Sequence, residues 1–95
     1  MIARSGLVVF SERYPDAKRS VDAWWAEAKR AQWCQPADIK AHYRSASILR
    51  NDRAVFNICG NNYPLIVKFE YQFWIGFVKF IGTHHEYDQI NAEEV

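Results

Sequence analysis

Cysteine is scarce in this sequence: Cys34 and Cys59 are its two cysteines, and no CxxC pair is present. A small secreted domain built on disulfide bonds would carry more of them, so we expect reduced thiols in a cytoplasmic protein. No apolar run approaches the ~20 residues that a membrane-spanning helix needs. The N-terminal segment also lacks the apolar stretch and the small-residue cleavage site of a signal peptide. We therefore expect neither secretion nor a membrane partner.

The common motifs of metal and nucleophile sites are missing as well. The four glycines are scattered rather than gathered into a phosphate-binding loop, and neither GxSxG nor HExxH occurs. His84 and Asp88 lie four residues apart, a spacing that permits two metal ligands on one helical face. Glu86 would be a third donor and His42 a distant one, and no cysteine is near them in the sequence. The sequence therefore favours no bound metal.

A strong charge of one sign is also lacking, because the net charge is +1. The distribution is uneven, however. Between Lys18 and Arg53 there are eight basic and four acidic residues, whereas the chain from Glu86 onward has four acidic residues and no Lys or Arg. The basic middle part suits a polyanionic partner, yet a near-neutral total equally fits an ordinary solvated surface.

What the sequence does have is apolar and aromatic residues, at 49% and 16% of the chain, enough for one compact domain over residues 1–95. The run LVVF at 7–10 predicts a first strand, because it is short and β-branched. Residues 14–33 then change to helical spacing, and Pro36 suits the first position of a second helix. The apolar stripe of the first helix consists of Val21, Trp24, Trp25 and Ala28. We expect the adjacent tryptophans to pack in the core, with base stacking as the alternative.

The second half of the chain predicts a sheet. Residues 44–53 are polar and turn-rich, which indicates a loop. The apolar period then becomes two in three segments, 54–60, 63–72 and 73–82, and their short connections favour an antiparallel meander. One face of this sheet should cover the helices, while the other presents Lys68 and Asn57. The expected fold is α+β: an N-terminal strand, two helices, a three-stranded antiparallel meander and a short C-terminal helix.

The polar cluster THHEYD follows the last strand. Thr83 and Glu86 fit a capping box, in which each side chain bonds to the other residue's backbone amide, so a helix should begin here. His84 and His85 then fall in the first turn of that helix. A histidine close to Tyr87 can share acid–base work with it.

Two segments carry a family resemblance. YRSASILRNDRAVFNICGNNY at 43–63 and FIGTHHEYDQI at 80–90, with the strand between them, resemble the HigB-type toxins of the RelE/ParE superfamily. The resemblance runs from residue 21 to residue 90 and implies a single RelE-like toxin domain. It further implies an mRNA interferase that cuts messages on the ribosome and is blocked by a helix-turn-helix antitoxin of the HigA type. In related ribonucleases the RNA 2′-hydroxyl attacks the neighbouring phosphate, so the enzyme supplies proton transfer and charge neutralisation without metal or cofactor.

The resemblance also implies roles for particular residues. His84 and Tyr87 match the motif positions of a proton-transfer pair, and Lys68 is the expected partner of the phosphate oxygens. His85 falls at a variable position. The expected RNA-binding residues are Asn57, Arg44, Asn61 and Lys79. Asn61 is alternatively a plain turn residue, and Lys79 a solvated strand charge that shares a face with Ile75, Phe77 and Ile81.

Pro64 departs from the family pattern, because many relatives carry an arginine there. Proline lacks both that charge and a ladder donor, so we expect this strand to lie at an edge or to be bulged at this point. Losing a phosphate-clamping arginine costs on the order of 10²-fold in rate. Either Lys68, Arg44 or another basic residue compensates, or the toxin is weak or inactive. The alternative function is that of a non-catalytic or degenerate ParE/RelE-like toxin that acts only by protein binding.

Overall fold

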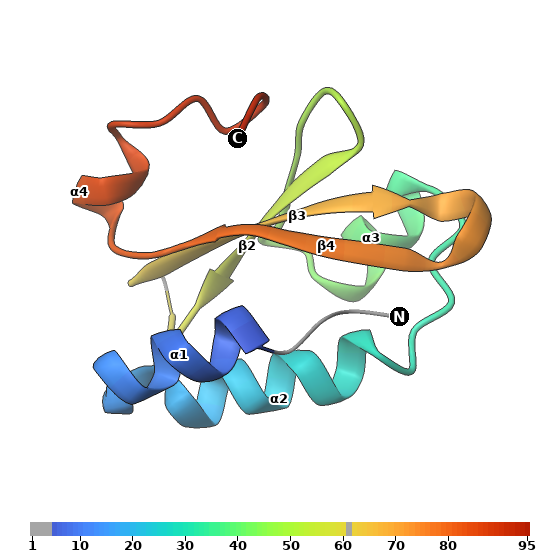
Figure 1. Cartoon of the computed structure of the whole chain (residues 1–95). Coiled ribbons are helices and arrows are strands. Elements are labelled where there is room, and N and C mark those ends of the chain that lie inside the picture. Colours follow the sequence, from blue (N-terminus) through green and yellow to red (C-terminus); the bar gives the residue numbers. More distant parts are fainter. Residues whose placement is uncertain (1–4, 61) are drawn as a thin grey trace.

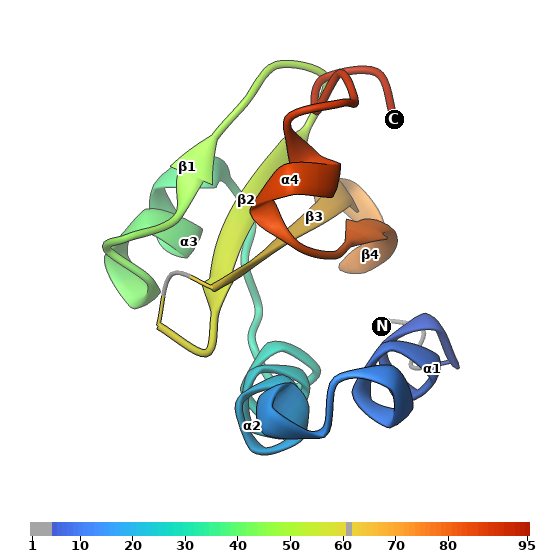
Figure 2. The same cartoon turned by 90° about the vertical axis from the view of Figure 1, so that its left-hand side faces the viewer.

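The computed structural model describes residues 5–60 and 62–95. A four-stranded antiparallel sheet, in the order β1-β2-β3-β4, separates two layers. Helices α1 and α2 cover one face, and α4 with the segment that follows it lies over the other (Figures 1 and 2). The elements are α1 (Ser5–Arg13), α2 (Lys18–Ala28), α3 (Pro36–His42), β1 (Ser47–Ile48), β2 (Arg53–Ile58), β3 (Tyr63–Glu70), β4 (Ile75–Ile81) and α4 (His84–Tyr87), with 3-10 turns at Pro15–Ala17 and Tyr71–Phe73. The α+β class is confirmed.

The predicted N-terminal strand is wrong, because residues 7–10 lie inside helix α1. Leu7, Phe10 and Ser11 are buried at helical spacing, whereas Val9 between them is 67% exposed. A four-residue apolar run cannot distinguish a strand from one buried helical turn. Here the tertiary contacts decide, since the buried stripe of α1 packs into the core under β4.

The two predicted helices are confirmed as α2 and α3. Trp24 of α2 is buried in the core, which excludes it as a base-stacking platform. Trp25 is half-buried, and the Lys29 ammonium lies 4.1 Å from the centre of its ring. Pro36 occupies the first turn of α3, and Asp38 in the same turn accepts a hydrogen bond from the Cys34 amide at 2.9 Å.

The sheet has four strands rather than three, because β1 forms inside the predicted loop 44–53. Ser47 pairs with Val55 and Ile48 with Ala54. Asn51 and Asp52 have φ angles of +59° and +60°. Positive φ at both central positions is the geometry of a type I′ hairpin turn, which Asn and Asp tolerate. The polar residues therefore turn the chain between two strands instead of forming an open loop.

Alternation along the strands gives the sheet two different faces. The inner face, toward α1 and α2, holds the core, and the outer face lies opposite. Inner-face residues are Ala54, Phe56, Ile58, Leu65, Val67 and Phe69. Outer-face residues are Arg53, Val55, Asn57, Pro64, Ile66, Lys68, Phe77 and Phe80.

The expectation that Pro64 marks an edge strand or a bulge is wrong. β3 is a central strand, and its one irregularity in pairing with β4 lies between Ile66 and Val67. The Pro64 carbonyl accepts from the Gly82 amide at 3.4 Å. Because the N and O of one strand residue point to the same side, the Pro64 nitrogen faces the end of β4, where no ladder bond is needed.

The irregularity is a bulge in β4. Ile66 pairs with Phe80 and Val67 with Val78, so Lys79 has no direct partner on β3. The extra residue reverses the alternation, as bulges do. Phe77 and Phe80 therefore both face outward, and the expected shared face of Ile75, Phe77, Lys79 and Ile81 does not form.

Candidate active site

Helix α4 begins at a well-defined capping box, as predicted. The Thr83 amide donates to Glu86 Oε1 at 3.0 Å, and the Glu86 amide donates to Thr83 Oγ1 at 3.2 Å. The Thr83 hydroxyl also donates to Glu86 Oε1 at 3.2 Å. The Thr83 amide first, and then this hydroxyl, lower the pKa of Glu86 below its usual range. Gly82 is buried directly before the cap, and a Cβ added there would lie 2.9 Å from both Glu86 Oε1 and the Phe80 ring. The close approach fixes α4 against the end of β4.

The two motif residues occupy the two ends of α4. His84 is exposed at the first position, and Tyr87 is half-buried at the last. The Tyr87 ring lies 6.3 Å from the ring of Phe80, which faces outward opposite Ile66. Helix α4 therefore lies at the edge of the outer face, which we call its rim, and the Tyr87 ring lies near Phe80 of that face. His85 is exposed, with Nε2 3.0 Å from Gln89 Nε2.

Lys68 lies on the outer face, as predicted, and is half-buried. Its ammonium is 3.9 Å from a Glu70 carboxylate oxygen. The direct partner of Lys68 on the neighbouring strand β2 is Arg53, which was not among the residues predicted for the site. Alternation places Arg53 on the same face as Asn57, four residues on, so the pattern that gave Asn57 would also have found it.

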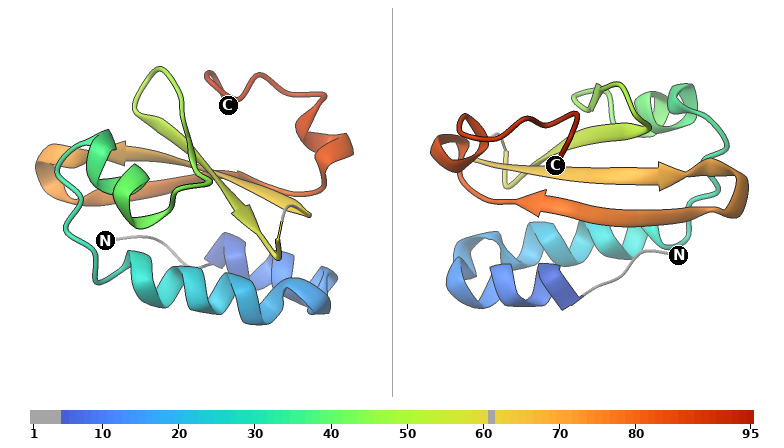
Figure 3. Two further views of the ribbon diagram at one scale, coloured as in Figure 1. Left: turned by 180° about the vertical axis from the view of Figure 1, so that it is seen from behind. Right: turned by 45° about the horizontal axis from the view of Figure 1, so that its top comes forward.

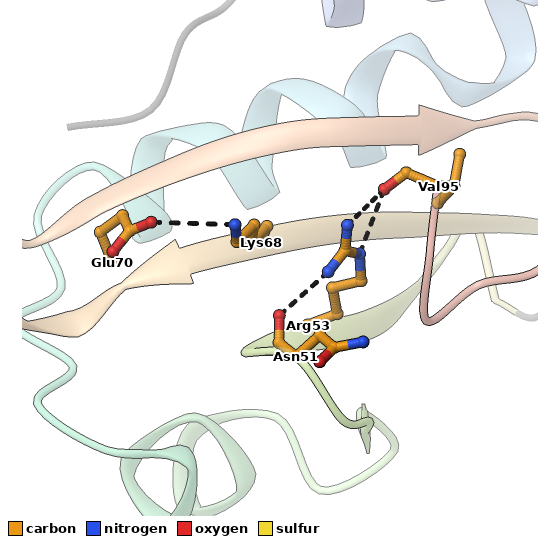
Figure 4. A network of polar contacts seen from close by, with 5 residues as sticks. All are labelled: Asn51, Arg53, Lys68, Glu70 and Val95. Carbon is orange, nitrogen blue, oxygen red and sulfur yellow. Dashed lines mark hydrogen bonds and ion pairs between the residues drawn. The ribbon is translucent and has the colours of Figure 1, made fainter.

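The Arg53 guanidinium is held by the C-terminal segment. Nε and Nη2 donate to the Val95 backbone oxygen at 3.1 and 2.6 Å, and Nη1 donates to the Asn51 carbonyl at 3.0 Å (Figure 4). Asn51 Nδ2 also donates to the Glu93 carbonyl at 2.9 Å. The segment after α4 therefore runs back across the outer face to the β1–β2 turn (Figure 3).

The expected RNA-binding residues are only partly brought together. Asn57 is half-buried on the outer face, where its amide donates to the Ser45 carbonyl at 3.1 Å. Lys79 is exposed at the bulge. Arg44 is exposed before β1, and three strand spacings from β1 to β4 amount to ~14 Å, so it is not a neighbour of α4. Asn61 lies outside the described residues.

A hollow of about 260 Å³ lies between α2 and β2, away from α4. It is lined in part by Trp24, Glu27, Tyr43 and Asn57. Of the described residues that line it, only Asn57 was predicted to belong to the functional site. The Tyr43 hydroxyl donates to Glu27, and His42 Nε2 lies 3.4 Å from the same carboxylate. Burial first, and then Glu27, raise the pKa of Tyr43 above its usual range. This cluster is separate from His84.

Residues 5–60 and 62–95 contain no group of three or more His, Cys, Asp and Glu side chains placed to hold a metal ion. In the same part of the chain, no helix has the length and apolar character to cross a membrane.

A family model for the HigB toxin, described as the RelE-like toxic component of a toxin–antitoxin system, matches residues 17–90. The matched segment includes α2, α3, all four strands and α4. No curated protein matches the chain significantly.

Proposed function

The chain belongs to the HigB toxin family and is thus the toxic component of a toxin–antitoxin system, and from this we propose that it is a ribosome-dependent endoribonuclease. Its substrate is translated mRNA, so it acts in the cytoplasm. A toxin of this kind has an antitoxin partner, and we propose a helix-turn-helix antitoxin of the HigA type.

One observation carries the proposal: the outer face of the sheet has basic side chains close to α4, which carries His84 and Tyr87. Lys68 and Arg53 are cross-strand neighbours on this face. Tyr87 packs on Phe80 of the same face, with His84 one helical turn before it. A phosphodiester that lies across the outer face would meet positive charge on the sheet and proton donors and acceptors at the rim.

The chemistry follows the needs of RNA cleavage by its own 2′-hydroxyl. The 2′-oxygen bonds to phosphorus as the bond from phosphorus to the 5′-oxygen breaks, which leaves a 2′,3′-cyclic phosphate and a 5′-hydroxyl. One member of the pair His84 and Tyr87 takes the proton from the 2′-hydroxyl, and the other gives a proton to the departing 5′-oxygen. Lys68 neutralises the charge that builds up on the phosphate oxygens. Asn57, Arg44, Asn61 and Lys79 are proposed to bind the RNA further from the reacting atoms.

A second function is favoured by Pro64, which places no charge on the outer face where many relatives carry an arginine. In this alternative the chain is a degenerate toxin that acts by protein binding alone. The two functions differ in whether mRNA is cut.

The test is translation of a defined message in a bacterial cell-free system, with mapping of new mRNA 5′-ends. Wild type should produce cuts in register with codons, and His84→Ala should reduce them about 10²- to 10⁴-fold. His85→Ala is the matched control, because His85 is the adjacent exposed histidine on α4 and should retain cleavage. Inhibited translation with intact mRNA would support the binding alternative. Cleavage unaffected by His84→Ala would contradict the proposed role of His84.

A further inference from the structure

Three outer-face side chains form one straight row across the sheet. Arg53 of β2 pairs with Lys68 of β3, and Lys68 pairs with Phe77 of β4. Side chains of directly paired residues point to the same face, with Cβ atoms ~5 Å apart. The row, defined as Arg53, Lys68 and Phe77, therefore spans about 10 Å, two strand spacings.

The Phe77 end of the row presents an aromatic ring. Phe77 is 45% exposed, although it belongs to a strand rather than a loop. The β4 bulge turns Phe77 outward, and the Lys79 ammonium lies 5.9 Å from the centre of its ring. An exposed ring flanked by cations is the combination that single-stranded nucleic-acid sites use, because any base can stack on the ring while cations hold the backbone.

The Arg53 end of the row presents two guanidinium donors, Nε and Nη2, which together are called the fork. Arg53 is only 8% exposed, and two N–H groups of its guanidinium converge on one oxygen, that of Val95. Two parallel donors of a guanidinium match the spacing of phosphate oxygens, and shielding from water strengthens such a contact. Lys68 next to it adds a second cation, balanced by Glu70 at 3.9 Å.

We propose that this row binds one nucleotide of the mRNA, with the phosphate between Arg53 and Lys68 and the base stacked on Phe77. The phosphate takes the position of the Val95 oxygen, so the end of the C-terminal segment leaves the fork when RNA binds. This inference rests on the proposed function, since it assigns RNA to the same face. It adds Arg53 and Phe77 as residues that position the substrate, and Arg53 supplies the guanidinium that Pro64 cannot.

Binding of a short RNA tests the aromatic end. The probe is a tetranucleotide that carries 2-aminopurine and 2′-O-methyl groups, so that it cannot be cut and its fluorescence falls on stacking. Phe77→Leu should weaken binding about tenfold and remove the quenching, whereas Phe77→Tyr should keep both. Phe73→Leu is the control, because Phe73 is 63% exposed in the β3–β4 turn and lies outside the row.

The salt dependence of binding tests the cationic end. Each lost phosphate contact makes the negative slope of log K against log salt shallower by about 0.7 for a single strand. Lys68→Gln and Arg53→Gln should each make it shallower by this amount, a change that a purely structural role would not produce. If Arg53→Gln fails to fold, Lys68→Gln and Phe77→Leu still decide the question.

The outcomes separate this inference from the proposed function. Absence of saturable binding by wild type, or equal loss in Phe77→Leu and Phe73→Leu, would overturn the row. So would a Phe77→Leu variant that binds the tetranucleotide normally and loses only antitoxin binding, which would assign Phe77 to a protein interface. Loss of quenching in Phe77→Leu supports the row even where His84→Ala leaves mRNA cleavage intact, a result that contradicts the catalytic role of His84 alone.

Discussion

At the scale of single residues, Glu86 links the start of α4 to protonation. The backbone amide and the hydroxyl of Thr83 donate to its carboxylate at 3.0 and 3.2 Å and lower its pKa. The unfolded chain has the ordinary glutamate pKa of ~4.3, so it binds the proton more tightly than the folded state does. The stabilisation from Glu86 is therefore complete above that value and is lost as the pH falls through the lower folded-state pKa.

Glu86→Gln should accordingly lower the free energy of unfolding at pH 7 but not at a pH below the folded-state pKa of Glu86. The glutamine amide can still accept from Thr83, so the difference reports the charge. Urea unfolding midpoints of both proteins between pH 7 and pH 2 measure it. Glu12→Gln, at an exposed position of α1, is the comparison variant with the same chemical change. A constant difference at every pH would contradict the assignment.

At the scale of elements, the junction between β4 and α4 depends on Gly82. Its φ angle is not positive, so glycine is needed for space and not for backbone conformation. A methyl group there meets the Phe80 ring and the Glu86 carboxylate at 2.9 Å, closer than van der Waals contact allows. The cap, the position of Tyr87 and the rim of the outer face all depend on this approach.

Gly82→Ala should therefore destabilise the protein by about 1–3 kcal/mol. Gly6→Ala is the matched control, because a Cβ at Gly6 meets no atom within 4 Å. Within α1 that change should be neutral or stabilising, by up to ~1 kcal/mol. Chemical denaturation of the two variants gives both values. Equal effects would show that Glu86 and Phe80 shift at no cost.

The same junction shows what the sequence can predict. The capping box is local, so Thr83 and Glu86 gave the start of α4 and the positions of His84 and Tyr87 correctly. Elements that depend on contacts with distant parts of the chain were not predicted correctly. Residues 7–10 are helical because one face of that helix packs into the core. Strand β1 forms because the Asn51–Asp52 turn brings it beside β2.

The row on the outer face depends on register, which one sequence does not contain. Arg53 and Lys68 are neighbours only because β2 and β3 pair in one of several possible alignments. Phe77 faces outward only because of the bulge at Lys79, which simple alternation does not anticipate.

At the scale of the whole molecule, an aromatic cluster joins the helices to the sheet. Phe56 of β2 is 2% exposed and lies at its centre. Ring centres at 5.0 to 6.2 Å belong to Trp24, Trp33, Tyr43 and Phe69. These rings come from α2, from the segments on either side of α3, and from β3, so one side chain of β2 joins α2 and the surroundings of α3 to the sheet.

Phe56→Ala should cost about 3–5 kcal/mol, since the cavity is surrounded by rings that cannot collapse into it. Domains of this size have a total stability of only about 5–15 kcal/mol, so the variant should be close to unfolding at 37 °C. Urea denaturation at 25 °C measures the loss, with Phe73→Ala at the exposed turn as the control of similar chemistry. A loss below about 1 kcal/mol would contradict the central position of Phe56.

The contact between Val95 and Arg53 also has a practical meaning. Any residue joined to Val95, whether native or added, leaves the fold on the outer face, directly beside the proposed RNA row. Under the RNA binding proposed above, a purification tag or a fluorescent fusion at that position would compete with the message and lower the measured activity. Helix α1 lies on the other side of the sheet, so a label on α1 itself leaves the outer face clear. The position chosen for a label therefore decides whether the outer face stays accessible in the assay.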